Sequence, residues 1–497
     1  MNNTFITALE NTFNYKLTEN MAIALKSTGS KVCDLFAFGA AYRNRSEEDC
    51  ILLFKEAFEE DPDLAMKCLF YIRDCRGGQG ERRFFRVCYK WLADNDPAGY
   101  TNLIYVSEYG RWDDLLCLLD TRLKKEVCLI IKNQLILDME DAIDNKAISL
   151  LAKWLPSENA HSIQTKKYAK IIRNYLNMTS KQYRQMLSKL RNHLNVLERL
   201  MSSNQWDKIE FDKIPSKAGL IYRNAFARRD MIAEKYKNFA INGNNKVNAD
   251  TLYPYEVVRE VTKRYYSEIS KVDRAMINKY WDNLKDYFNG ANASMLCVID
   301  TSGSMSWTSY GNVMPIDVAI SLGLYCAEHM TGPFSGKYIS FASQPQFIET
   351  KGIDFVDKVK RIYKTNLVDN TNLTAVFKLL LKTALRHDVK TEDIPKTIVV
   401  ISDMEIDAQS EWNSKTAITE MDRIREEWAA YGLELPKLVY WNINARNDTI
   451  LDSGPNVSFV SGCSPIIFES VLTGKQGIEL MMEVLMKDRY KNIKMIT

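Results

Sequence analysis

Strand-like apolar runs alternate with segments of helical periodicity after residue 290. The strand-like runs are "MLCVI" (295–299), "KYISFAS" (337–343), "QFIET" (346–350), "TIVVIS" (397–402), "KLVYWNI" (437–443) and "NVSFVS" (456–461). Strand alternating with helix is typical of a parallel sheet covered by helices on both faces. "QFIET" follows its neighbour too closely for a crossover, so we expect it to be an antiparallel edge strand. Residues 291–497 are therefore predicted to form a doubly wound α/β domain.

The first 290 residues carry apolar side chains at spacings of three and four, as in "DLAMKCLFYIRDC", "RRFFRVCYKWLAD" and "WDDLLCLLD". Connectors containing Gly, Pro, Asn or Asp separate these segments, and we expect no strand among them. Successive helices of this kind predict an α-solenoid over residues 1–290. Because no exact repeat period is visible, we expect degenerate HEAT-like helix pairs, so the fold class is multidomain, with an all-α repeat region before the α/β domain.

Oxygen-bearing side chains follow two of the predicted strands and precede a helix that lies between them in the sequence. Asp300, Ser302 and Ser304 form an Asp-x-Ser-x-Ser turn after "MLCVI", Thr371 precedes a helix in "NTNLTAVF", and Asp403 follows "TIVVIS". Ligands of open α/β sheets bind at the carboxyl ends of the strands, so these five residues should converge there. Hard oxygen ligands favour Mg²⁺, or another divalent cation such as Mn²⁺ or Ca²⁺.

Two other interpretations of this turn remain open. Asp300 could cap the turn while the serines bond only local backbone, as these residue types often do. Ser302 could also be the nucleophile of a hydrolase, but the chain has no G-x-S-x-G elbow around it and no histidine follows at a strand end. We therefore expect a binding protein and not an enzyme.

"DTSGSMS", "NTNLTAV" and "VVISDM" resemble, in order and setting, the metal-ion-dependent adhesion site (MIDAS) of von Willebrand factor A domains. The resemblance implies that Asp300, Ser302 and Ser304 coordinate the cation directly. It implies that Thr371 does so directly or through water, and that Asp403 does so through water.

Several blocks of the helical part also resemble a known family. They are "FYIRDCRGGQGERRFFR", "EYGRWDDLL", "AKWLPSE", "YRQMLSKLR" and "NQWDKIEFDKIPSKA". They are similar to an uncharacterised family of plants, fungi and phages that places a helical region before a von Willebrand A domain. That family in turn resembles the Ro autoantigen, or TROVE, proteins, ribonucleoprotein components in which HEAT-like repeats form a ring closed by the A domain. The resemblance implies RNA binding, with structured RNA on the outside of the ring and single-stranded 3′ ends in its hole.

Basic side chains offer candidate RNA contacts. Arg73, Arg76, Arg82 and Arg83 surround a glycine-rich connector whose backbone amides and guanidinium groups could hold phosphates, and Lys153, Lys166 and Lys167 belong to a second basic stretch. The net positive charge of the chain lies in the first 290 residues, whereas the rest is net negative. The alternative is an ordinary solvated helix face, with Asp74 and Glu81 pairing with the nearby arginines.

Aromatic side chains can stack on unpaired bases, so four tryptophans are further candidates. Trp112, Trp154, Trp206 and Trp281 recur within amphipathic helices, and this setting favours roles in helix packing.

Composition excludes several classes of protein. No apolar run is long enough to span a bilayer, and the first residues lack the pattern of a secretory signal, so we expect a cytoplasmic protein without a membrane partner. The ten cysteines contain no CxxC pair and the four histidines are scattered, so a zinc site is not expected. Two hypotheses remain: a Ro-like RNA-binding ring, and a scaffold whose A domain captures an acidic protein partner through the bound cation.

Overall fold

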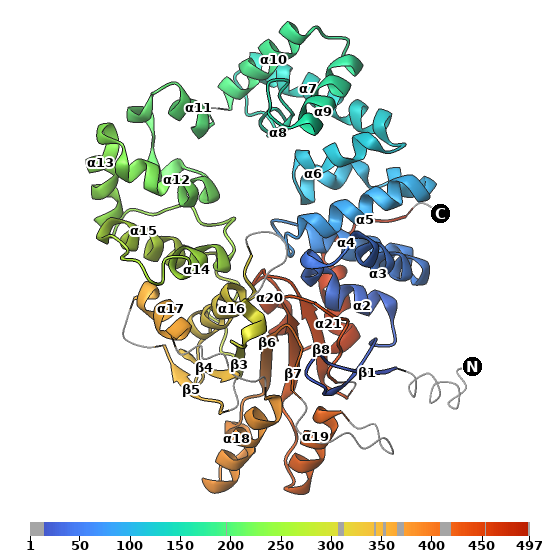
Figure 1. Cartoon of the computed structure of the whole chain (residues 1–497), viewed down its shortest axis with the longest axis vertical. Coiled ribbons are helices and arrows are strands. Elements are labelled where there is room, and N and C mark those ends of the chain that lie inside the picture. The colour runs from blue at the N-terminus through green and yellow to red at the C-terminus, as the bar shows by residue number, and fades with distance from the viewer. Residues whose placement is uncertain are drawn as a thin grey trace.

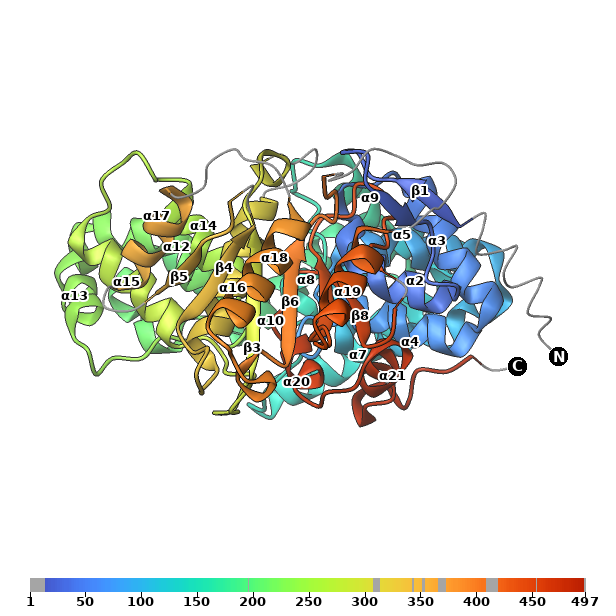
Figure 2. The ribbon, with the colours of Figure 1, turned by 90° about the horizontal axis from the view of Figure 1, so that it is seen from below.

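The computed structural model describes residues 14–194, 196–306, 313–341, 344–350, 354–364, 372–407, 419–452 and 454–495. An arch of helices stands on a domain built around a mixed, mostly parallel sheet (Figure 1). Seen from below, the molecule is much flatter than it is wide (Figure 2). The pattern changes from helix to sheet between Asp282, where the last helix of the arch ends, and Met295, where the sheet begins.

The sheet has six strands in the order β5-β4-β3-β6-β7-β8. They are β3 (Met295–Asp300), β4 (Lys337–Phe341), β5 (Phe347–Glu349), β6 (Thr397–Ser402), β7 (Lys437–Asn442) and β8 (Val457–Ser461). All neighbouring pairs are parallel except β4 and β5, which pair antiparallel at the edge. Each strand lies on a predicted run, so the six strands and the antiparallel edge are confirmed.

Helices cover both faces of the sheet because its central strands are apolar on both faces. Val298 and Val400 belong to the core beneath α18 (Leu373–Arg386) and α19 (Glu420–Ala430). Ile299 and Ile401 point to the other core, which is shared with the helical arch and contains α16 (Pro315–His329), α20 (Ile467–Val471) and α21 (Gly477–Leu485). The alternation of side chains along a strand thus divides the sheet domain into an outer core and one continuous with the arch.

The arch consists of helices joined by short connectors. In chain order they are α2 (Lys31–Phe38), η1 (Gly39–Asn44), α3 (Glu47–Glu60), α4 (Pro62–Arg73), α5 (Arg82–Asn95), α6 (Val106–Tyr109), η4 (Trp112–Asp120), α7 (Lys124–Ile143), α8 (Leu151–Trp154), α9 (Ile163–Tyr175), α10 (Ser180–His193), α11 (Leu197–Ser202), α12 (Ser216–Arg228), α13 (Asp230–Ile241), α14 (Pro254–Thr262) and α15 (Lys271–Asp282). Local sequence fixes several of their starts. The Asp61 carboxylate accepts a hydrogen bond from the Leu64 amide (2.9 Å) just before Pro62, a combination that favours a helix start.

A small hairpin corrects the expectation that the first 290 residues contain no strand. It consists of β1 (Tyr15–Leu17) and β2 (Ile23–Leu25), which are too short for an alternating pattern to be recognised in the sequence. Ala22 and Ala24 are buried in the outer core of the sheet domain, and Leu25 exchanges backbone hydrogen bonds with Ile450. The hairpin is therefore a separate two-stranded sheet that packs on the sheet domain.

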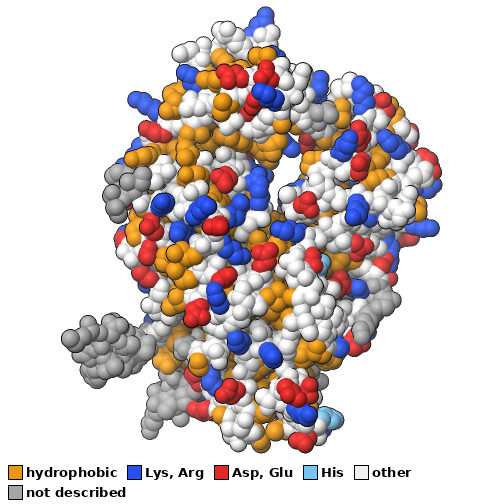
Figure 3. Space-filling model, turned by 180° about the vertical axis from the view of Figure 1, so that it is seen from behind, with side chains coloured by type: hydrophobic (Ala, Val, Ile, Leu, Met, Phe, Trp, Pro, Cys, Tyr) orange, Lys and Arg blue, Asp and Glu red, His pale blue; other side chains and the backbone are white. Residues whose placement is uncertain are grey.

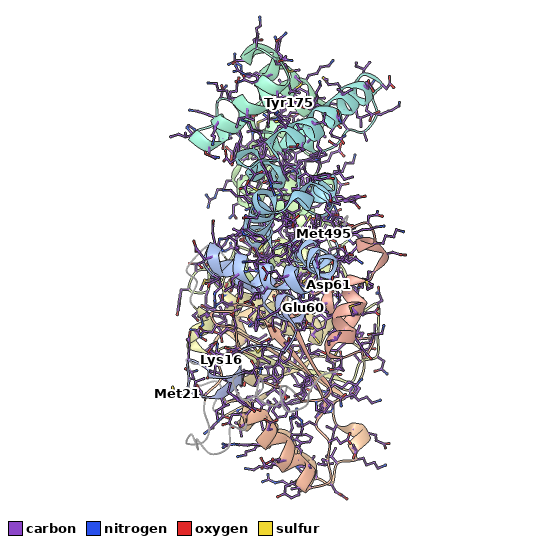
Figure 4. All side chains as sticks on the ribbon, turned by 90° about the vertical axis from the view of Figure 1, so that its right-hand side faces the viewer. Lys16, Met21, Glu60, Asp61, Tyr175 and Met495 are labelled. Carbon is purple, nitrogen blue, oxygen red and sulfur yellow. The ribbon has the colours of Figure 1, made fainter. Side chains whose placement is uncertain are left out.

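Both ends of the arch contact the sheet domain, so the described chain closes into a ring (Figure 1). On one side α2 packs against β8, and on the other α14 packs against α16 while α15 packs against α17 (Phe355–Lys364). The segment after α21 returns to the first side of the arch. There the Met495 amide donates to the carboxylate of Asp63 (2.6 Å), and Figure 4 shows Met495 beside Asp61 at the start of α4.

Candidate functional site

The carboxyl edge of the sheet brings together four of the five residues predicted to hold a cation. Parallel pairing of β3 with β6 sets the two strand ends side by side. Asp300 Oδ2 accepts a hydrogen bond from Ser402 Oγ (2.5 Å), and Asp300 Oδ1 accepts one from the Ser302 amide (2.9 Å). The hydroxyls of Ser302 and Ser304 lie 3.0 Å apart, and Ser304 in turn hydrogen-bonds the Asp403 carboxylate. Thr371 lies outside the described residues.

Two carboxylates are buried at this edge. Asp300 and Asp403 both have an exposed fraction of 0%. Burial, and next the neighbouring Asp403, raise the pKa of Asp300 to about 7. Burial also raises the pKa of Asp403, against the lowering effect of the Arg446 guanidinium, whose Nη2 lies 3.0 Å from Asp403 Oδ2. Among the described side chains, Asp403 therefore has Arg446 as a cationic partner, whereas Asp300 is bonded to Ser402 and to the Ser302 amide and forms no ion pair.

Arg446 also joins this edge to the N-terminal hairpin, because its guanidinium pairs with Glu19 as well as with Asp403. Within the described ranges, no group of three or more His, Cys, Asp or Glu side chains has an arrangement suited to a metal ion. The candidate site at the edge of the sheet is not a group of this kind, because it consists of two carboxylates and serine hydroxyls.

A second candidate site is the hole of the ring, a cavity of about 1020 Å³. Figure 3 shows the opening from behind, with Lys and Arg side chains along its rim. Its lining comes from both limbs of the arch and from the sheet domain. The cationic residues of the lining are Arg43, Arg73, Arg76, Arg82, Arg83, Arg111, Lys153 and Lys217, whereas the acidic ones are Glu81, Glu198 and Glu256.

The structure separates the predicted RNA contacts into three groups. Arg76, Arg82, Arg83 and Lys153 line the cavity, with Arg76 and Arg82 exposed. Arg73 reaches the lining but is only 2% exposed. Lys166 and Lys167 lie on α9, outside the cavity lining.

Three of these cations are engaged by carboxylates, and the weakest case is Arg82, whose Nη1 lies 3.9 Å from Asp113 Oδ2. Arg73 is held against the buried Asp114 by two hydrogen bonds of 2.6 and 2.8 Å. Lys167 pairs with Asp120 at 2.5 Å. For Arg76, Arg83 and Lys153, the described residues provide no carboxylate within 4.0 Å.

Most backbone amides of the glycine-rich connector are engaged inside the protein, which weakens the hypothesis that they hold a phosphate. The amides of Gly78 and Gly80 donate to the Asp74 carbonyl, and those of Gln79 and Glu81 donate to carbonyls of α4. The Arg76 amide donates to the Asp74 carboxylate (2.9 Å). These five donors are satisfied by the connector and by α4, so a phosphate contact there would depend mainly on side chains.

The connector instead joins the arch to the sheet domain. Gln79 Oε1 accepts from the Ser464 amide (3.0 Å), just beyond β8. Asp74, which is fully buried, pairs with Arg489 and accepts from the Tyr490 hydroxyl (3.1 Å). The expected pairing of Asp74 with a neighbouring arginine is therefore replaced by a pairing with the far end of the chain. Glu81 does pair within the first limb, with Arg43 at 3.5 Å.

The tryptophans divide between the cavity and the helix interfaces. Trp112 and Trp154 are half-buried and line the cavity, together with Tyr222, Tyr253 and Tyr255. Trp206 packs against Phe226, and the buried Trp281 stacks on Phe355. The packing role expected from the sequence therefore fits Trp206 and Trp281 best.

Arg111 is a cavity residue that sequence reasoning missed. Its guanidinium lies 4.1 Å from the centre of the Trp154 ring and forms two hydrogen bonds of 2.9 Å with Asp113. Arg111 and Trp154 belong to different elements, so no local spacing in the sequence could have brought them together.

Two family models together match most of the chain. The model of a domain of unknown function, DUF2828, matches residues 18–137 and 159–303, and a second, DUF7788, matches residues 294–494. An uncharacterised protein, L728, of Acanthamoeba polyphaga mimivirus is 30% identical over 506 residues, covering 93% of this chain and 85% of that protein. The chain belongs to the DUF2828 family.

The comparison with solved structures also gave a weak match. The crystal structure of the Ro (RSR) protein of Deinococcus radiodurans has a TM-score of 0.34 and 13% sequence identity, covering 92% of this chain and 99% of that chain.

Among the described residues, no helix combines the length and the apolar character required to cross a membrane.

Proposed function

We propose that this protein is a Ro-like RNA-binding protein whose HEAT-like arch, closed by a von Willebrand A domain, holds RNA in the hole of the ring. The observation that carries the proposal is the cavity lining, in which eight cationic side chains face three acidic ones. RNA is a polyanion whose affinity for proteins comes largely from contacts between Lys or Arg and phosphates. A ring lined in this way binds RNA without catalysing a reaction.

Three lining cations are best suited to phosphate. Arg76, Arg83 and Lys153 have no carboxylate within 4.0 Å among the described residues, so a phosphate would meet no competing protein anion at these positions. Arg73 and Arg111 are already paired with aspartates and contribute mainly to the positive field of the wall.

The aromatic lining favours unpaired RNA over a duplex. Trp112, Trp154 and three tyrosines border the same cavity as the cations, and aromatic rings stack on bases that are not already paired. A space of about 1020 Å³ accommodates a few nucleotides of a single strand. Basic side chains on α9 and α10 leave structured RNA a place on the outer surface, as the resemblance to Ro proteins implies.

Binding of an unstructured RNA oligonucleotide, followed by fluorescence anisotropy at several salt concentrations, tests the proposal. Arg76→Ala and Lys153→Ala should each weaken binding and reduce the slope of log K against log salt by about 1. Lys382→Ala, which removes an exposed lysine from α18 in the sheet domain, is the matched control and should change neither value. Wild-type protein that binds no RNA at low salt, or cavity variants that behave as the control does, would contradict the proposal.

Stacking and charge can be tested separately in the same assay. Trp154→Ala should cost about 1–3 kcal/mol of binding free energy, the usual value of one base stack, and leave the salt slope nearly unchanged. If Trp154→Ala instead weakens binding and also lowers the slope of log K against log salt by about 1, the indole of Trp154 only positions the Arg111 guanidinium.

We also propose that the edge of the sheet holds Mg²⁺, or another divalent cation such as Mn²⁺ or Ca²⁺. The side chains that would hold it are Asp300, Ser302 and Ser304, together with Asp403 and Thr371. The fit rests on two adjacent buried carboxyl groups with raised pKa values, of which only Asp403 is paired with a guanidinium among the described residues. A bound cation would neutralise these carboxylates, and its remaining coordination positions would hold exchangeable ligands such as water. Terbium luminescence or calorimetry with Mg²⁺ alone should detect binding in the wild type and its loss in Asp300→Asn.

The second candidate function is capture of an acidic protein partner at this edge. A partner carboxylate would complete the coordination of the cation, and the helical arch would serve as a scaffold. Copurification from a cytosolic extract, with identification of both RNA and protein, separates the two candidates. RNA retention that requires Arg76 and Lys153 supports the RNA-binding ring, whereas protein retention that requires Asp300 supports the scaffold.

A further inference from the structure

Helix α7 exposes a straight apolar stripe on the side opposite its packed face. Leu129, Ile136 and Ile143 are 48%, 41% and 70% exposed. They are seven residues apart, which is nearly two helical turns, so they lie one above another along the helix. The buried side chains Val127 and Ile131 lie on the opposite face and pack into the arch. The stripe is therefore a surface of the helix that the arch leaves uncovered.

The charges along α7 run against the preference of an isolated helix. Lys124 and Lys125 lie in its first turn, whereas Glu140 and Asp141 lie near its end, and its last turn has no basic residue. The helix dipole favours the reverse arrangement, with acidic groups at the start and basic groups at the end. Glu126 is an acidic exception in the first turn. This arrangement of charges does not stabilise α7 by itself, so another reason for it has to be found.

The stripe and its flanking charges are symmetric about Ile136. Leu129 and Ile143 are each seven residues from it, and Lys132 and Glu140 are each four residues from it. In an antiparallel pair of identical helices, Leu129 would meet Ile143, Ile136 would meet its own copy, and Lys132 would lie next to Glu140. The basic start of one helix would also lie beside the acidic end of the other, which relieves the unfavourable charge layout of each.

We propose that α7 is a homodimer interface, in which two copies of this chain pair antiparallel about a twofold axis at Ile136. The self-complementary charge pattern identifies a second copy as the occupant, because an isologous interface requires the same surface to match itself. α7 is at the top of the arch in Figure 1, on the far side of the ring from the sheet domain. Pairing there leaves both candidate binding sites accessible and places two rings in one particle.

A single helix pair buries less than the roughly 1,200 Å² typical of stable interfaces, so we expect a weak dimer with a Kd of about 1–100 µM. Sedimentation equilibrium of the full chain, after nuclease treatment to remove bridging RNA, measures this value directly. Ile136→Glu should raise the Kd at least tenfold, because two carboxylates would then meet on the axis. Ile478→Glu, at a similarly exposed isoleucine of α21, is the matched control and should leave the Kd unchanged.

Charge exchange distinguishes antiparallel self-pairing from any other arrangement. Lys132→Glu and Glu140→Lys should each raise the Kd about threefold or more, whereas the double variant should return close to the wild-type Kd. These positions are exposed, and circular dichroism verifies that each variant is folded. A wild type that stays monomeric at high concentration, a dimer insensitive to Ile136→Glu, or single variants that the double exchange does not rescue would each overturn the proposal. The test is independent of the proposed RNA binding.

Discussion

Arg73 illustrates the difference between the charge of a residue and its role. Its sequence neighbourhood is that of a phosphate-binding arginine, yet its side chain is buried and held by Asp114. Arg86 approaches the same carboxylate, at 2.7 Å, and the Arg111 amide donates to it (2.8 Å). Buried ion pairs of this kind fix the relative positions of elements more than they bind ligands.

Substitution of Arg73 should therefore affect folding first. Arg73→Ala leaves the buried Asp114 with fewer partners, and breaking such a pair costs about 3–5 kcal/mol of unfolding free energy. Urea unfolding followed by tryptophan fluorescence measures the loss. Lys153→Ala, at a cavity cation without a carboxylate partner among the described residues, should change the stability by less than about 0.5 kcal/mol. Equal stability of the Arg73 variant and the wild type would contradict the structural role.

Asp317 is a second residue whose position determines its behaviour. It accepts hydrogen bonds from Thr262 Oγ1 (2.7 Å) and Arg259 Nη1 (3.2 Å) at the contact between α16 and α14. Burial raises its pKa from the ordinary 3.8 to about 6, with Thr262 and Arg259 opposing the shift. The protonated form is thus favoured in the folded protein, and its contribution to stability is complete below about pH 4 and lost as the pH rises through about 6.

Asp317→Asn should flatten this dependence, because the amide oxygen can still accept from Thr262 without carrying a charge. The stability of the wild type relative to the variant should fall by about 3 kcal/mol between pH 4 and pH 7, as expected for a shift of about two pKa units. Urea unfolding at several pH values measures this difference. If the unfolding free energies of the two proteins change equally between pH 4 and pH 7, the Asp317 carboxyl does not titrate as described.

At the scale of elements, the glycine-rich connector between α4 and α5 has a structural rather than a phosphate-binding design. A Cβ at Gly78 would lie 2.0 Å from the Tyr71 carbonyl oxygen, so the close return of the chain onto α4 requires glycine there. The same return places Asp74 and Gln79 against the sheet domain.

Gly78→Ala should consequently destabilise the protein by about 1–3 kcal/mol, because a backbone atom has to move. Gly243→Ala is the matched control, since a Cβ there meets nothing within 4 Å, and it should be neutral or stabilising by up to about 1 kcal/mol. Thermal unfolding of the two variants beside the wild type compares them. A Gly78 variant as stable as the Gly243 variant would mean that the connector relaxes without cost.

Sequence patterns predicted elements well where burial is uniform along an element. The central strands read as apolar runs because helices cover both of their faces, and α18 was recognised from its period. The hairpin of β1 and β2 escaped notice because three residues cannot display a period. At the sheet edge, the order of the strands sufficed to bring Asp300 close to Asp403. The ring cavity was not predictable in detail, because Arg111 and Trp154 meet through the packing of α8 against η4, which no local spacing in the sequence indicates.

At the scale of the whole molecule, the two joints of the ring differ in construction. The first limb is fixed by α2, by the hairpin and by the segment carrying Arg489, whereas the second relies on α14 and α15. In this second joint, Trp281 stacks on Phe355 with ring centres 4.2 Å apart and donates to Glu328 (2.8 Å). Arg274 adds ion pairs with Asp354 and Asp357. The second joint therefore combines the packing of α14 on α16 with an aromatic stack and ion pairs between α15 and α17.

Removing Trp281 should loosen the ring at this joint. Trp281→Ala deletes a ring that is only 3% exposed, and such deletions cost about 3–5 kcal/mol. Because that energy resides in the contact of α15 with α17, we expect faster amide hydrogen exchange in both helices and a larger radius of gyration by small-angle X-ray scattering. Trp206→Ala, whose ring packs on Phe226 within the same limb, should affect exchange locally without enlarging the particle. If both variants keep the wild-type radius and α15 remains protected, α14 and α16 alone are sufficient to keep the ring closed.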